Sequence, residues 1–174
     1  TYQGANPVSR PLSRRALHLM YGNLERATFD GADREARRAV SLGSHLAGLA
    51  FSNAGLGAVH ALASAVGGMV DRPHGECLAV SLEPGLRYNL PVRREEYAAV
   101  ARDLGVGDDA ESLVAAATRL RDSLGLPGSF AAFGLERSDA DAIVEKTLVQ
   151  ERRLKTNPRE VTGDLRDAVV ASIV

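Results

Sequence analysis

Apolar residues recur every three or four positions along most of the chain, the spacing that gathers them on one face of a helix. The second predicted helix carries Leu42, Leu46 and Leu49 on one apolar stripe. Gly43 and Gly48 lie on its other face, where small residues let another helix approach closely. The helices predicted in this way span about residues 9–24, 33–51, 97–104, 113–124, 138–148 and 162–173.

The stretch 53–68 differs from these because it is apolar almost throughout. A helix that is apolar on all sides is buried, so we expect a central core helix here that ends at Gly67 and Gly68. A turn over 71–75 and another helix follow. Pro84 lies inside that helix and is expected to kink or end it, because proline removes a backbone hydrogen bond.

The composition supports an all-α class. Alanine (27 residues) and leucine (22) dominate the 174 residues, whereas isoleucine occurs twice, and alanine and leucine favour helices. The length suits one domain, 1–174. A net charge of −1 and a single cysteine argue against nucleic-acid binding and a disulfide framework. No apolar run reaches the roughly 20 residues of a membrane span, and no signal peptide is recognised. We therefore expect a cytoplasmic protein without a membrane partner.

The histidines are the residues most informative about chemistry. His18 and His45 are expected to have surface or structural roles. His60 lies among apolar residues, and a buried imidazole must find partners for both ring nitrogens. His74 follows a proline at a predicted helix start, where the helix dipole favours the neutral, metal-binding form. One interpretation is that both histidines bind a metal ion. The other is that His60 is a hydrogen-bonded core residue and His74 a turn residue. The spacing of the two histidines alone is only a weak indication of a metal site.

A nucleotide site within the chain is not predicted. The segment 55–60 reads Gly-Leu-Gly-Ala-Val-His, in which His60 replaces the third glycine of a dinucleotide fingerprint. No strand precedes it, so the geometry that brings a pyrophosphate to a helix N-terminus is absent. The sequence also lacks a P-loop, an HExxH motif and a GxSxG motif.

The chain contains the segment Gly-Leu-Ala-Phe-Ser-Asn-Ala-Gly-Leu-Gly-Ala-Val-His-Ala-Leu-Ala, which ends three residues after His60. This segment closely resembles the C-terminal domain of the iron-containing (group III) alcohol dehydrogenases. The resemblance extends over nearly the whole chain. Its other segments are 4–9, 67–68, 73–75 and 156–162.

This resemblance implies an NAD(P)-dependent oxidoreductase that interconverts small alcohols and aldehydes or ketones. Fe²⁺, or in some members Zn²⁺, is held in the cleft between an N-terminal α/β nucleotide-binding domain and an all-helical C-terminal domain of the dehydroquinate synthase-like type. Two of the three histidine ligands match His60 and His74, and Phe51 and Leu56 match residues of the substrate pocket. Ser64 stands where many members have a histidine implicated in proton relay, so we predict at most a relay role for it.

The remaining Asp and His ligands and the nucleotide-binding domain are expected upstream of this chain, so the 174 residues alone are predicted to be inactive. NAD or NADP would be bound mainly by that missing domain, which is thus a partner of this one, and a homo-oligomer is a further possibility. Two alternatives stay open. One is a related enzyme of the glycerol dehydrogenase or dehydroquinate synthase type. The other is a helical interaction module without catalysis, which predicts that His60 and His74 lie on unrelated faces.

Overall fold

The computed structural model describes residues 3–173, and within this range the chain is helical without any strand. This confirms the all-α class. The helices are α1 (Ser9–Tyr21), α2 (Leu24–Phe29), α3 (Arg34–Ala54), α4 (Ala58–Gly67), α5 (His74–Leu104), α6 (Ala110–Ser123), α7 (Ala140–Leu148), α8 (Glu151–Leu154) and α9 (Leu165–Ala171), with short 3₁₀ turns η1 (Phe130–Phe133) and η2 (Arg137–Asp139).

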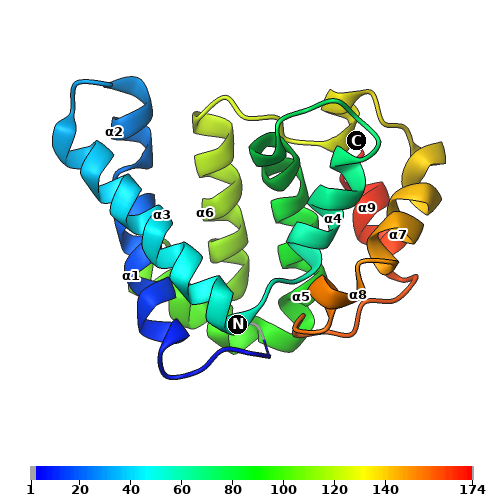
Figure 1. Ribbon diagram of the computed structural model, residues 1–174, viewed down its shortest axis with the longest axis horizontal. Helices are drawn as coiled ribbons and strands as arrows, with labels where there is room; N and C mark the ends of the chain where they lie inside the picture. The colour runs from blue at the N-terminus through cyan, green and yellow to red at the C-terminus, as the bar shows by residue number, and fades with distance from the viewer. Residues whose placement is uncertain (1–2, 174) are drawn as a thin grey trace.

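Helices α1, α2 and α3 form an arm at one end of the molecule (Figure 1). The prediction for Gly43 is confirmed, since a Cβ there would lie 2.7 Å from Met20 Cγ of α1. The prediction for Gly48 is wrong, because a Cβ there would meet no described atom within 4 Å. The apolar stripe also faces outward in part: Leu42 is 49% and Leu49 43% exposed. The face of α3 that packs on α1 is instead built from small residues.

Two helix boundaries differ from the sequence prediction. The first helix ends at Tyr21 rather than near residue 24, and the separate helix α2, which was not predicted, follows it. Pro84 does not end α5: the helix continues past it with helical φ and ψ, and the proline is fully buried. The bend in α5 occurs at Arg93, two residues after Pro91, so the predicted helix 97–104 is the second half of α5.

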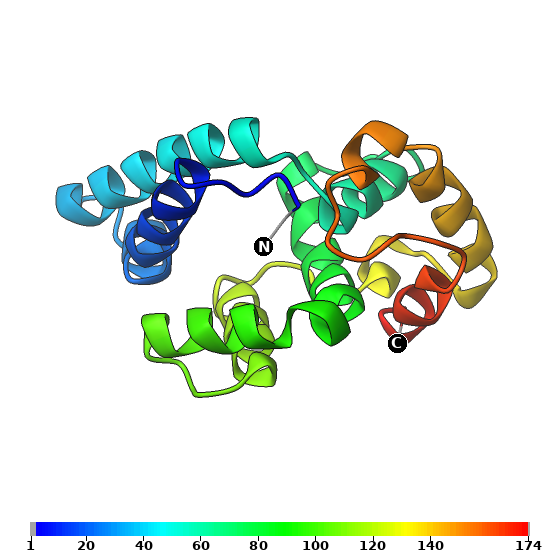
Figure 2. The ribbon, with the colours of Figure 1, turned by 90° about the horizontal axis from the view of Figure 1, so that it is seen from below.

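Helix α4 lies at the centre of the other part of the molecule, surrounded by α5, α7 and α8 (Figure 2). Its burial confirms the predicted core helix, although the helix begins at Ala58 because residues 53–54 complete α3. The core around it joins segments from distant parts of the chain. Its largest fully buried side chains include Leu62, Val66, Val80, Phe130, Ile143, Leu165 and Val169.

Helices α3 and α4 meet at an angle of 105° across the short turn 55–57. Within residues 3–173 no single helix is long and apolar enough to cross a membrane; only this bent pair, taken together, reaches the required length and composition.

Candidate active site

The turn between α3 and α4 is held by a segment about 100 residues further along the chain. Gly55 has a φ of +82°, a conformation that favours glycine, and a Cβ there would lie 2.3 Å from Thr156 Oγ1. The Thr156 hydroxyl donates a hydrogen bond of 2.6 Å to the carbonyl oxygen of Leu56. This contact fixes the path of the chain between Phe51 at the end of α3 and His60 in α4.

Asn157 caps the first turn of α4. Its Oδ1 accepts hydrogen bonds from the backbone N–H of Ala58 at 2.9 Å and from Asn89 Nδ2 at 3.1 Å. Its Nδ2 donates to Asn89 Oδ1 at 2.8 Å. Sequence reasoning placed Asn157 only within the segment 156–162 of the family resemblance, and missed this capping role. The signal that could have indicated the role of Asn157 is that a polar residue occurs in the segment 156–162, whose sequence resembles that of the family.

The structure brings His60 and His74 together. His60 lies in the first turn of α4 and His74 is the first residue of α5, as predicted, and their ring centroids are 6.4 Å apart at an interplanar angle of 54°. A ligating imidazole has its ring centre about 3 Å from the ion, so this separation lies at the outer limit for two rings that share one ion. The interaction-module alternative predicted the two histidines on unrelated faces, which is not the arrangement observed.

The surroundings of His60 favour a neutral imidazole with free nitrogens. Its Nδ1 is fully buried and has no hydrogen-bond partner among the described residues. Burial is the main cause that lowers the pKa of His60 below its ordinary value of 6.5, and the neighbouring His74 and Arg153 lower it further. A neutral, unpartnered imidazole beside a second histidine is the donor set that Fe²⁺ and Zn²⁺ accept. The two residues therefore fit a metal centre.

These two histidines do not complete a metal site by themselves. Over residues 3–173, no group of three or more His, Cys, Asp or Glu side chains is arranged to hold a metal ion. A four-coordinate ion at His60 and His74 would thus need further ligands from outside this range.

A pocket of about 550 Å³ opens beside the histidine pair, between the end of α3 and helix α8. Phe51 and Leu56, the two predicted pocket residues, both line it, and the Phe51 ring centroid lies 6.3 Å from that of His60. The α8 side of the pocket was not predicted. The full lining is Phe51, Ser52, Gly55, Leu56, Val149, Gln150, Glu151, Arg152 and Arg153.

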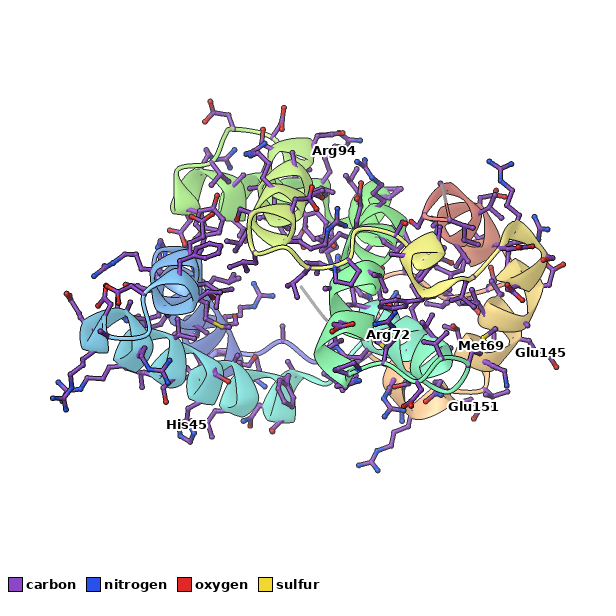
Figure 3. All side chains as sticks on the ribbon, turned by 90° about the horizontal axis from the view of Figure 1, so that it is seen from above. His45, Met69, Arg72, Arg94, Glu145 and Glu151 are labelled. Carbon is purple, nitrogen blue, oxygen red and sulfur yellow. The ribbon has the colours of Figure 1, made fainter. Side chains whose placement is uncertain are left out.

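The other residues singled out in the sequence lie as follows. Ser64 is half-buried on α4, one turn beyond His60, and its hydroxyl makes no hydrogen bond to a described residue. His45 is exposed on α3, away from the site (Figure 3). His18 lies 3.0 Å from the carboxylate of Asp103, in an exposed contact that joins α1 to the end of α5. His18 is thus on the surface, as expected. His45 was expected to be a hydrogen-bonded structural residue, but it is exposed and makes no hydrogen bond to a described residue.

Comparison with known sequences identifies the family. The profile of the Fe-containing alcohol dehydrogenase family, C-terminal, matches residues 2–173, and the chain belongs to this family. The chain is 37% identical over 163 residues to 1,3-propanediol dehydrogenase of Klebsiella pneumoniae, covering 90% of this chain and 42% of that protein. It is 31% identical over 167 residues to the NAD-dependent methanol dehydrogenase of Bacillus methanolicus, covering 92% and 44%.

Solved structures agree with this assignment. A 1,3-propanediol oxidoreductase superposes with a TM-score of 0.93 at 34% identity, over 98% of this chain and 47% of that one. An alcohol dehydrogenase from Oenococcus oeni also gives a TM-score of 0.93, at 32% identity, over 98% and 46%. The chain spans less than half the length of these relatives, and of the curated relatives above.

Proposed function

We propose that this chain is the metal-binding C-terminal domain of an NAD(P)-dependent alcohol dehydrogenase that interconverts small alcohols and aldehydes or ketones. The observation that carries the proposal is the pairing of His60 and His74 beside a pocket lined by Phe51 and Leu56. Family membership and the similarity to propanediol and methanol dehydrogenases support it.

In this proposal His60 and His74 hold Fe²⁺ or Zn²⁺ through neutral imidazoles, together with an Asp and a His from the N-terminal domain. Lewis acidity toward the substrate oxygen is the chemistry that such an ion supplies when bound. Phe51 and Leu56 hold the carbon chain and exclude water. Ser64 would act at most as a proton relay between groups from outside the described residues, since a serine hydroxyl is a poor base by itself. A nicotinamide, bound mainly by the missing domain, would supply or accept hydride at the substrate carbon.

The main alternative within the superfamily is an enzyme of the glycerol dehydrogenase or dehydroquinate synthase type. The relatives include propanediol, methanol and long-chain alcohol dehydrogenases, which favours the iron group. The domain limits, 1–174, and a cytoplasmic location stay predictions, as do the choice between NAD and NADP and the formation of a homo-oligomer.

The test is ligand removal in the full-length protein. His60→Ala and His74→Ala each delete one expected ligand, so we expect loss of bound metal and a fall in turnover of more than about 100-fold, beyond the effect of residues that only support a ligand. Metal content is measured by elemental analysis, and turnover with NAD(P)H and a panel of small aldehydes. His45→Ala, on the exposed face of α3, is the matched control. Full metal content and turnover in either ligand variant would refute that residue's assignment.

A further inference from the structure

The α8 side of the pocket carries two arginines, Arg152 and Arg153, against one carboxylate, that of Glu151. Arg152 and Arg153 both line the pocket and are exposed to it, and neither forms an ion pair within residues 3–173. The guanidinium of Arg153 donates a hydrogen bond to the side chain of the neutral Gln150, which leaves its charge uncompensated. Two cations in such a position can attract an anion that enters the pocket.

The rest of the lining does not cancel this charge. Glu151 is the one acidic residue among the lining residues, so the three ionisable side chains leave one net positive charge. Phe51 and Leu56 contribute an apolar wall. An arginine at the end of a partly apolar pocket is well suited to a carboxylate, because its planar guanidinium can donate two parallel hydrogen bonds to the two oxygens.

The charged wall lies close to the proposed reaction centre. The Phe51 ring, which lines the same pocket, is 6.3 Å from the His60 ring. Helix α8 also packs directly against α4, which carries His60. His60 and His74 are not among the residues that line the pocket, so Phe51 is the lining residue that links it to the histidine pair. A substrate that passes Phe51 toward His60 would have its other end near Arg153.

We infer that this enzyme acts on carbonyl compounds that carry a carboxylate at the end remote from the reacting carbon, and that Arg153, assisted by Arg152, determines this specificity. The inference rests on the proposed function for its reaction, and adds the substrate class. In the step itself, hydride from NAD(P)H adds to the aldehyde carbon and a proton adds to its oxygen. The aldehyde is thereby reduced to a primary alcohol and NAD(P)H is oxidised to NAD(P)⁺, while the carboxylate is unchanged.

The experiment compares an anionic substrate with a neutral one of the same shape. The full-length metal-loaded enzyme is assayed with 4-oxobutanoate and with 4-oxobutanamide, each with NAD(P)H. We expect the carboxylate to be preferred in kcat/KM. Arg153→Gln is expected to lower kcat/KM for the carboxylate by about 10- to 100-fold, the value of hydrogen bonds to a charged group, mainly through KM. The kcat/KM for 4-oxobutanamide should change little.

Two further variants separate charge from packing. Arg153→Lys keeps a positive charge without the planar fork, so it should restore part of the preference. Arg37→Gln, which removes an exposed arginine of α3 far from the pocket, should leave both kcat/KM values unchanged. If the wild-type enzyme reduces both substrates equally and Arg153→Gln does not alter their ratio, the inference is wrong while the proposed function stands. If Arg153→Gln raises KM for NAD(P)H instead, the arginine serves a nucleotide phosphate, and the inference is again wrong.

A binding measurement distinguishes failure of the inference from failure of the reaction. Succinate cannot be reduced in this step, but it presents the same carboxylate to Arg153. Calorimetric titration of succinate into the full-length protein should give binding that Arg153→Gln weakens by a similar factor and Arg37→Gln does not. Succinate binding of this kind without turnover of any aldehyde would refute the proposed reaction and support the anion site. Absence of Arg153-dependent binding would overturn the anion site, whatever the turnover.

Discussion

Helices α3 and α4 are neighbours in sequence and both are rich in alanine, yet they occupy different environments. Helix α4 buries Ala61, Leu62 and Val66 completely, because other helices pack around it. Helix α3 packs mainly on α1 and α2, and leaves Leu42 and Leu49 nearly half exposed. An apolar position thus indicates burial only where a partner element covers that face of the helix.

The two helices also begin in different ways. Asp33 caps α3 locally, since its carboxylate accepts a hydrogen bond of 2.9 Å from the N–H of Ala36. Helix α4 has no cap of its own at Gly57, and its first N–H groups include one satisfied by Asn157, 99 residues away from Ala58. The scaffold helix is therefore started by its own sequence, while the helix that carries His60 is started by the tertiary structure.

The largest stability difference between the helices is expected for leucine truncation. In the 174-residue chain, Leu62→Ala removes a fully buried side chain of α4 and should lower the free energy of unfolding by about 2–5 kcal/mol. Leu42→Ala, on the exposed side of α3, should change it by less than about 0.5 kcal/mol. Urea denaturation followed by circular dichroism measures both. Equal losses would show that the α3 face is covered in solution.

Removal of the two capping side chains should give a smaller difference in stability than the leucine truncations. Asn157→Ala leaves the buried N–H of Ala58 and the side chain of Asn89 without their partner, so we expect a loss of about 1–3 kcal/mol. It should also broaden the NMR signals of the His60 ring, because the start of α4 loses its anchor. Asp33→Ala removes an exposed local cap, worth about 1 kcal/mol. No change at His60 on replacing Asn157 would mean that α4 holds its own start.

The smallest effect concerns pH. Because the pKa of His60 is lowered in the folded state, both states are neutral well above 6.5, and only the unfolded state gains a proton as the pH falls below that value. The metal-free 174-residue chain should therefore lose stability from pH 7 towards pH 5. The free energy of unfolding should change by well under about 1.4 kcal/mol per pH unit, the limit for the uptake of one proton, because His60 is only partly buried.

The source of this slope can be assigned by substitution. His60→Gln in α4 should flatten the dependence of the unfolding free energy on pH. His45→Gln in α3 keeps His60 and should therefore keep the slope. Denaturation midpoints at several pH values give the comparison, and a slope that survives His60→Gln would place its origin elsewhere.

The sequence by itself determined the helical class, the core helix around Leu62 and the start of α3 near Asp33. Through its resemblance to the family, the sequence also identified the two histidines that the fold brings together. These features depend on residues within one or two helical turns of each other, or on a long contiguous motif, so they can be interpreted along the chain.

Only the tertiary structure decided which face of α3 is buried, how the turn after Gly55 is held and what forms the second wall of the pocket. Thr156 and Asn157 reach the turn from about 100 residues away, and Arg153 enters the pocket from the same distant segment. The spacing of residues along one helix contains no information about such contacts, because they arise from the packing of elements that are far apart in sequence. The arginine that we propose sets the substrate class is for this reason recognisable only in the folded chain.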